Sequence, residues 1–320
     1  MASKALWYVE KGRTELRDAL VAAPGPGDVR IRARFGAVSR GTERLVFEGR
    51  VPESEFERMR APFMDGTFPY PVKYGYATVG TVDEGQNRGR SVFVLHPHQS
   101  EFIVPAHAAA LVPEGVPPQR AVLAANMETA LNAVWDGAPG PADRIAIVGG
   151  GVVGLLVARL CARTPGTQVT VVDVAPARAE TARAFGAGFA TPDSAPDGCD
   201  VVFHASASAA GLATALALAG EEGAVVELSW YGTGDVAAPL GEAFHSRRLR
   251  LLSSQVGKVA ASHRPRWTYH RRLSAALALL DDAALDVLLA PPVDFSDLPA
   301  RLPALLAADA DARCPLIRYP

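Results

Sequence analysis

Three glycines are the first residues whose types and spacing suggest chemistry. Gly149, Gly151 and Gly154 follow the apolar run "IAIV" directly and open a segment of helical composition. In a strand–turn–helix unit, the first such glycine permits a tight turn and the second lets the backbone approach a pyrophosphate. The third lets the helix pack closely on the strand. The pattern therefore predicts a dinucleotide site; a sheet with an empty crevice is the alternative.

The residues around the glycines extend this prediction to the whole nucleotide. The helix is expected to begin at Val152 and Val153, so that its N–H groups face the phosphates. Asp173 ends the next strand, 19 residues after Gly154, where a carboxylate would accept hydrogen bonds from the adenosine ribose. A carboxylate also repels a 2′-phosphate, which favours NAD(H). Arg178, five residues further on, could soften that preference and leaves NADP(H) as an alternative.

The elements that must position these residues are apolar strands alternating with helices. The runs "RIAIV", "QVTVV", "DVVFHA", "GAVVELSW" and "LRLLSSQVG" are separated by helical segments. Such alternation is typical of a parallel sheet covered on both faces, that is, an α/β fold with a Rossmann doubly wound sheet. Ligands bind such sheets at the carboxyl ends of the strands. Ser229 and Ser254 end later strands and are expected to face the nicotinamide.

The first part of the chain has a different pattern. Its short runs alternate apolar and polar residues at period two and are separated by Gly, Pro and Asn, which predicts a small antiparallel barrel or sandwich. We therefore expect a catalytic domain at residues 1–120 and a dinucleotide-binding domain at 121–265. Residues 266–320 are too few for a third domain and are expected to return to the first.

Composition excludes several classes of function. The chain has 320 residues, a hydrophobic fraction of 49% and a net charge of −2, so no basic excess indicates nucleic acid or an anionic membrane surface. No run of 18 apolar residues predicts a membrane span, and the charged N-terminal stretch is unlike a signal peptide. Three widely spaced cysteines suit a reducing, cytoplasmic location and exclude a four-cysteine zinc lobe (Cys161, Cys199 and Cys314).

A strand-rich first part, a central dinucleotide fold and a returning tail resemble the medium-chain dehydrogenase/reductase superfamily over nearly the whole chain. The counterparts of its motifs are "RGTE" (Arg40–Glu43), "GYATVG" (Gly75–Gly80) and "AANMETA" (Ala124–Ala130). The resemblance implies a GroES-like β-barrel catalytic domain, an active site in the cleft between domains, hydride transfer to or from nicotinamide, and a homodimer. The "SRGTE" element is also similar, more loosely, to bacteriochlorophyllide 2-hydroxyethyl dehydrogenases.

This chain departs from the zinc-dependent members at the positions of the metal ligands. Arg40 stands at the cysteine position, Tyr76 at the histidine position and Ala77 at the position of its glutamate neighbour, while the third ligand falls near Ala125. A catalytic zinc needs three N, S or O donors around an open position. The resemblance is therefore to a zinc-independent branch, with no metal site expected.

Without zinc, side chains must stabilise the charge that develops on a carbonyl oxygen. Thr42 aligns with the hydroxyl that relays protons in the zinc enzymes, although a turn hydroxyl bonded to local backbone is an equal alternative. Arg40 could stabilise an oxyanion or bind an anionic substrate group, or it could pair with Glu43 or with a carboxylate at the domain interface. Tyr76 could donate from its phenol, or it could be a packed aromatic.

Two further ionisable groups are candidates. His98, in "HPHQ" after a strand, could act as a general acid–base. With His96 and Glu128 it could instead form an unrelated metal site, although a single H-x-H pair is weak evidence. Glu128 could be a general acid if burial raises its pKa, or simply a carboxylate at the start of a helix.

Three functions remain open. The leading hypothesis is a zinc-independent, NAD(H)-dependent oxidoreductase that interconverts a carbonyl and an alcohol on a small organic molecule, in specialised metabolism. The second is reduction of an activated C=C, as in quinone and enoyl reductases. The third is a dinucleotide-binding sensor without turnover. The hydroxyls of Thr42 and Tyr76 and the nearby histidines favour the first.

Overall fold

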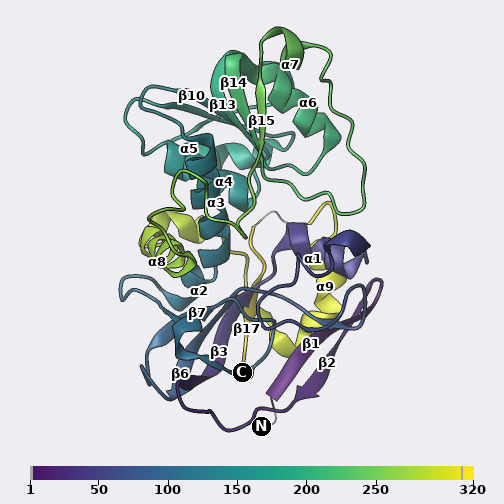
Figure 1. Cartoon of the computed structure of the whole chain (residues 1–320), viewed down its shortest axis with the longest axis vertical. Helices are drawn as coiled ribbons and strands as arrows, with labels where there is room; N and C mark the ends of the chain where they lie inside the picture. Colours follow the sequence, from purple (N-terminus) through teal and green to yellow (C-terminus); the bar gives the residue numbers. More distant parts are fainter. Residues whose placement is uncertain (1–2, 311–312) are drawn as a thin grey trace. The chain divides into compact units, whose positions relative to one another are not determined.

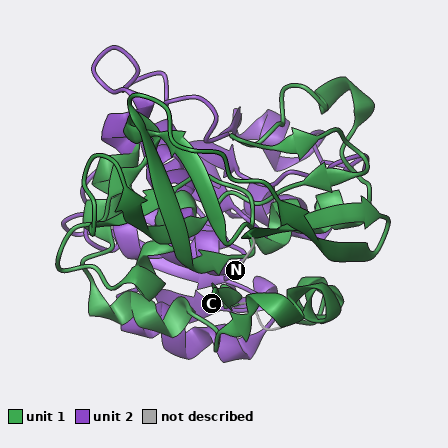
Figure 2. Cartoon of the chain, turned by 90° about the horizontal axis from the view of Figure 1, so that it is seen from below, with its two compact units in different colours: residues 1–125, 273–320 green, residues 126–272 purple. Residues whose placement is uncertain are grey.

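The computed structural model describes residues 3–310 and 313–320 of the chain. It divides into two compact units, which Figure 2 shows in different colours. Unit 1 comprises residues 1–125 and 273–320, and unit 2 comprises residues 126–272. None of the described helices is long and apolar enough to cross a bilayer.

Unit 2 is built on a six-stranded parallel sheet. Its strands lie in the order β12-β11-β10-β13-β14-β15, so the chain reverses direction across the sheet after β12. Strands β10, β13, β14 and β15 of this sheet are labelled in Figure 1. This doubly wound order confirms the predicted α/β fold. The strands are β10 (Arg144–Val148), β11 (Gln168–Val172), β12 (Gly188–Ala190), β13 (Cys199–His204), β14 (Ala219–Glu227) and β15 (Arg250–Ser253).

Helices cover both faces of this sheet, which explains its almost continuous apolar strands. On one face, every second strand residue, such as Ala146 and Val202, packs against α6 in one buried cluster. On the other face, Gly154 of α4 lies against Ile147, and Gly137 of α3 lies against Phe203. The helices are α3 (Ala124–Gly137), α4 (Val152–Cys161), α5 (Ala179–Ala184), α6 (Ala209–Leu218) and α7 (Ala243–Ser246), with short 3-10 turns at Pro176–Arg178 and Pro192–Ser194.

Unit 1 is the GroES-like part and consists of two sheets. The larger has the order β16-β17-β3-β6-β7-β9, with β8 also paired to β3, and the smaller has the order β2-β1-β5-β4. A bridge between Ala5 and Gln99 joins strand β1 to the chain just before β8. The strands are β1 (Ser3–Glu10), β2 (Arg13–Ala19), β3 (Asp28–Ala37), β4 (Asp65–Gly66), β5 (Val72–Lys73), β6 (Thr78–Glu84), β7 (Ser91–Val94), β8 (Glu101–Pro105), β9 (Ala110–Leu111), β16 (Val293–Asp294) and β17 (Leu316–Arg318).

The C-terminal segment returns to this unit as a strand. Strand β17 pairs antiparallel with β3, with Ile317 opposite Gly36. Tyr319 packs so closely that a Cβ on Gly36 would lie 3.1 Å from its ring, so the tail is a packed part of the larger sheet.

The remaining helices are short. They are α1 (Arg40–Phe47), α2 (Pro118–Ala121), α8 (Tyr269–Leu279) and α9 (Leu298–Leu306), with 3-10 turns at Glu53–Glu55, Ala106–Ala108, Ala283–Leu288 and Phe295–Asp297.

Candidate functional site

The glycine turn lies between β10 and α4, and a side chain at each of its three glycines would meet different surroundings. Gly149 has a φ of +110°, and a Cβ there would lie 2.7 Å from the backbone nitrogen of Ser206. A Cβ on Gly154 would lie only 1.9 Å from the carbonyl oxygen of Gly149. At Gly151, by contrast, a Cβ would meet no described atom within 4 Å. The first and third glycines shape the turn, and the second leaves its outer surface open to a ligand.

Helix α4 begins immediately after this open position. Gly151 is its N-cap, and the first intrahelical hydrogen bond runs from the N–H of Leu155 to the carbonyl of Gly151. The N–H groups of Val152 and Val153 therefore lie in the first turn, where α-helices leave their donors without helical partners. This arrangement fits the pyrophosphate of a dinucleotide, because donors and the positive end of the helix dipole coincide.

Asp173 follows β11 at the same edge of the sheet. Its carboxylate accepts hydrogen bonds from the N–H of Gly150 at 2.6 Å and from the N–H of Ala175 at 2.8 Å. These two bonds hold the carboxylate against the glycine turn, where it retains further acceptor positions for a ribose. The stem of Arg178 is adjacent, since a Cβ on Gly150 would lie 3.1 Å from its Cγ.

The ends of β13 and β14 carry a polar cluster on the other side of the turn. His204 is buried and its ring nitrogens contact Glu227 Oε2 at 2.7 Å and Ser206 Oγ at 2.7 Å. Burial alone would raise the pKa of Glu227, but hydrogen bonds from His204 and Ser229 outweigh it and hold that pKa below its ordinary value. Ser229 also accepts a bond from the N–H of Ala207 at 3.1 Å. The cluster braces the loops that follow these strands.

Ser254 and Glu128 lie in buried polar contacts of unit 2. The Ser254 hydroxyl donates to Asp136 at 2.7 Å. Glu128 forms an ion pair with Arg272, whose Nε lies 2.9 Å from the carboxylate, and both side chains are almost fully buried. Burial raises the pKa of Glu128 while Arg272 opposes that rise. The structure thus places Glu128 in a salt bridge within unit 2.

Tyr76 and Thr42 come together in unit 1, and Ser39 joins them. The phenol of Tyr76 donates to Ser39 Oγ at 2.5 Å. Burial raises the pKa of Tyr76 to about 12, although hydrogen bonds with Ser39 and Thr42 partly oppose the rise. A phenol of ordinary pKa is already protonated at neutral pH, and this one holds its proton more firmly still. It can act as a hydrogen-bond and proton donor, with two hydroxyls beside it.

His98 belongs to a second, fully buried cluster. Its Nε2 lies 2.9 Å from Glu43 Oε2, which also accepts the hydroxyl of Tyr8 at 2.6 Å. The other carboxylate oxygen accepts the N–H of Ser39 at 2.7 Å, so the two clusters meet at Ser39. His98 Nδ1 is buried and has no hydrogen-bond partner among the described residues. A proton on Nε2 fits this geometry, because it faces the carboxylate and leaves only an acceptor unsatisfied.

Arg40 and His96 lie in other contacts of unit 1. Arg40 donates to the carbonyl of Ala307 at 2.9 Å, at the end of α9, where Arg44 donates to the carbonyl of Leu306 at 2.6 Å. The carboxylate of Glu43, an alternative partner considered for Arg40, accepts hydrogen bonds from Tyr8 and from the N–H of Ser39. His96 stacks on Phe102 with ring centroids 3.7 Å apart, and burial lowers its pKa to about 3. Among the described residues, no three His, Cys, Asp or Glu side chains gather as a metal site.

Sequence reasoning did not assign roles to Ser39, Tyr8 or Glu43 in these clusters. Glu43 was visible in "RGTE", but nothing near it in sequence indicates partners 35 and 55 residues away. One local signal existed. Gly75 has a φ of +116°, and a Cβ there would lie 2.7 Å from the His98 ring, so this glycine in "YGY" marks a close approach.

The chain is similar in sequence or in structure to several known dehydrogenases. No protein-family model matches the chain. D-guloside 3-dehydrogenase of Escherichia coli K12 is 24% identical over 314 residues, which cover 85% of this chain and 87% of its own. A structure from Sinorhizobium meliloti 1021, named as a zinc-binding dehydrogenase and bound to NADP, has a TM-score of 0.79 at 20% identity, with 99% of each chain covered. A short chain alcohol dehydrogenase of Escherichia coli CFT073, complexed with NADH, has a TM-score of 0.79 at 16% identity over the full length of both. At these identities, the likeness shows that the chain has the fold of these dehydrogenases.

Proposed function

We propose that this protein is an oxidoreductase that uses NAD(H) to interconvert an alcohol and a carbonyl on a small polyhydroxylated molecule. The observation that carries the proposal is the glycine turn. Its second glycine is open on the outside, first-turn N–H groups of α4 follow it, and Asp173 is held against it. When bound, a nicotinamide cofactor supplies or accepts a hydride. Two similar structures hold NADP and NADH.

The residues of unit 2 would bind the cofactor in a defined way. The N–H groups of Val152 and Val153 would donate to the pyrophosphate beside Gly151. Asp173 would accept hydrogen bonds from the ribose hydroxyls, and its negative charge would repel a 2′-phosphate. This supports NAD(H) over NADP(H). Arg178 is close enough to the turn to make that preference moderate.

Tyr76 is the proposed proton donor to the substrate oxygen. Its phenol is protonated at neutral pH, as an ordinary tyrosine is, and burial raises its pKa further, to about 12. After the phenol has given its proton to the substrate oxygen, the Ser39 hydroxyl 2.5 Å away would donate its own proton to the phenolate, and Ser39 would in turn take a proton from Thr42 or from solvent. Thr42 is the second hydroxyl of this relay. The assignment favours a carbonyl over an activated C=C, since hydride addition to a carbonyl localises the negative charge on one oxygen, whereas an activated C=C spreads it over the conjugated system and needs less help from a donor.

We also propose that the reaction proceeds without zinc. Support comes from the side chains at the positions where the resembling zinc enzymes have ligands: Arg40, Tyr76 and Ala125 are not zinc donors. Metal analysis of the purified protein tests this, together with activity after dialysis against a chelator. Stoichiometric zinc whose removal abolishes activity would contradict the zinc-free proposal and leave the fold assignment untouched.

A substrate panel tests the reaction class. NADH oxidation would be followed at 340 nm with keto sugars, simple ketones, aldehydes, enones and quinones. Sugars are included because one relative is named for a guloside. We expect turnover with carbonyl substrates. Turnover with enones or quinones alone would favour the C=C reductase, and tight NADH binding without turnover on any member would favour a sensor.

A further inference from the structure

A long segment of unit 2 and α8 has an unusual charge pattern. Residues 243–280 contain eight lysines and arginines and no aspartate or glutamate, in a chain whose net charge is only −2. Within it, Lys258, Arg264 and Tyr269 line a cavity of about 520 Å³, together with Val259, Trp267 and Thr268. Two of these cations are in ion pairs, Arg248 with Glu222 and Arg272 with Glu128. The segment as a whole remains positively charged, which favours an anion at its cavity.

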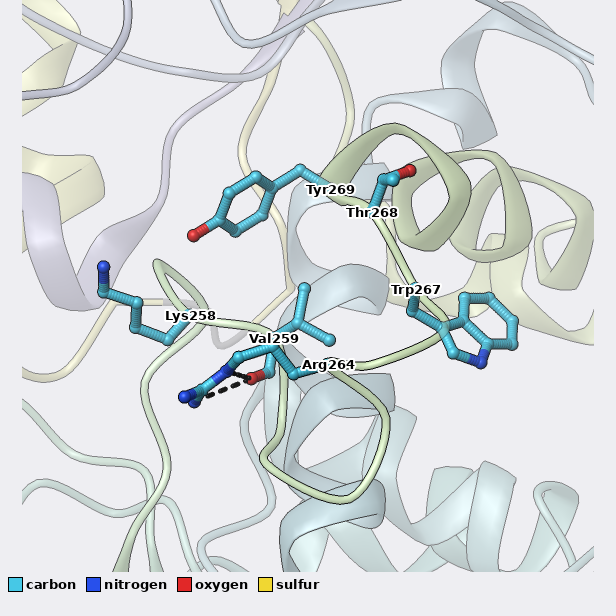
Figure 3. A pocket seen from close by; sticks show the side chains of 6 residues that line it. All are labelled: Lys258, Val259, Arg264, Trp267, Thr268 and Tyr269. Atoms are coloured by element: carbon cyan, nitrogen blue, oxygen red, sulfur yellow. Dashed lines mark hydrogen bonds between the residues drawn. The ribbon is translucent and has the colours of Figure 1, made fainter.

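The polar groups of the side chains that line this cavity also favour an anion. Figure 3 shows the ammonium of Lys258, the guanidinium of Arg264 and the hydroxyl of Tyr269 on one side of the loop, with the Trp267 ring turned away. Arg264 is held by two hydrogen bonds to the carbonyl of Val259, each 3.2 Å long, and its Nη1 has no partner among the described residues. The Lys258 ammonium likewise has no ion pair or hydrogen bond with a described residue.

The loop that carries these cations is fixed from beneath. Arg272 donates to the carbonyl of Lys258 at 3.1 Å and to the carbonyl of Val256 at 2.5 Å, while its Nε is paired with buried Glu128. Asn132 also accepts the N–H of Ala260 at 3.0 Å. The cost of ordering a lysine and an arginine around a ligand is reduced when their backbone is already held. This gives Glu128 a role as a positioning residue for the cavity.

The place of the cavity in the sheet distinguishes its ligand from the cofactor phosphates. The loop follows β15, the last strand of the order β12-β11-β10-β13-β14-β15. Neighbouring strands are about 4.8 Å apart, so β15 lies about 14 Å from β10 and its glycine turn. Asp173 is one strand further away still, at the end of β11. A dinucleotide that has its adenosine ribose at Asp173 and crosses the switch point between β10 and β13 would therefore have its nicotinamide half on the side of β15.

We propose that this cavity binds an oxyanion, phosphate or carboxylate, carried by the small substrate. The inference rests on the proposed function and narrows its substrate class to anionic molecules. Lys258 supplies a point charge and Arg264 a planar donor, a pair suited to terminal oxygens.

Binding of simple oxyanions to the NADH-loaded protein tests the proposal. Inorganic phosphate and acetate would be titrated by calorimetry against chloride at matched ionic strength, with NADH present so that phosphate cannot occupy the glycine turn. The variants are Lys258→Met and Arg264→Gln. Arg266→Gln is the matched control, since Arg266 is exposed in the same segment and does not line the cavity.

We expect saturable binding of at least one probe, with the dissociation constant raised about tenfold or more in each cavity variant and by less than about twofold in the control. NADH affinity and thermal stability should stay the same in all three. Absence of saturable binding in the wild type, or equal weakening in Arg266→Gln, would overturn the inference. If the wild type fails to bind NADH, the proposed function itself fails; intact NADH binding without oxyanion binding rejects only the anionic substrate class.

Discussion

The glycine turn of unit 2 and the hydroxyl cluster of unit 1 are built in opposite ways. The turn consists of six consecutive residues, and its shape follows from backbone sterics at Gly149 and Gly154. The hydroxyl cluster joins Tyr76 to Ser39 and Thr42 at the start of α1, more than 30 residues earlier in the chain, and its shape follows from side-chain hydrogen bonds. A backbone site therefore depends on the absence of side chains, whereas the hydroxyl cluster depends on the presence of particular ones. The two should respond differently to substitution.

Removal of one phenol should have the largest effect on activity. Tyr76→Phe should lower kcat for carbonyl reduction by about 10²–10³-fold, because general acid catalysis typically contributes that much. NADH affinity should not change. Tyr74→Phe is the matched control, since Tyr74 is a buried tyrosine two positions away that packs edge-on against Tyr76. Equal activity in Tyr76→Phe and the wild type would return Tyr76 to a packing role.

Glu43→Gln should have the largest effect on stability. The carboxylate is fully buried and accepts bonds from Tyr8 and from the N–H of Ser39, and it faces His98. An amide NH₂ would confront at least one of these donors, which should cost about 2–4 kcal/mol in the free energy of unfolding. Urea unfolding measures this. Glu48→Gln, at the end of the same helix, should change it by less than about 1 kcal/mol, and similar losses in both would show that the cluster is not special.

These contrasts explain what could be predicted from the sequence. The parallel sheet and glycine turn were predictable because an apolar strand, three spaced glycines and a helix are contiguous. Tyr76 and Thr42 were singled out by resemblance alone, and Ser39 was missed because its partner is 37 residues away. The Glu128–Arg272 pair spans 144 residues and was not foreseen, since only tertiary packing brings α3 to α8.

Two alanine substitutions in the turn separate binding from folding. Gly151→Ala should lower NADH affinity by about tenfold with little change in stability, because its Cβ meets no described atom. Gly154→Ala should instead lower the free energy of unfolding by about 1–3 kcal/mol, because its Cβ would collide with the Gly149 carbonyl. Calorimetric NADH titration and urea unfolding test the pair. Unchanged NADH affinity in Gly151→Ala would contradict the cofactor site.

Alkaline pH should produce the smallest effect. The pKa of Tyr76 is raised from 10.0 to about 12 in the folded protein, so its contribution to stability is complete below pH 10 and is lost as pH rises toward 12. Between pH 10 and 12 the free energy of unfolding should therefore fall less steeply with pH in Tyr76→Phe than in the wild type. The difference between the two slopes should correspond to the binding of up to about one proton. Parallel slopes would show that the phenol ionises as readily as in the unfolded chain.

Transfer of deuterium from cofactor to substrate tests the central claim most directly. NADH with deuterium at both C4 positions would be incubated with the carbonyl substrate that gives the fastest turnover in the panel, and the product analysed by mass spectrometry. We predict an alcohol that carries one deuterium on the former carbonyl carbon. A product without the label, or label found instead on a carbon of a reduced C=C, would contradict it.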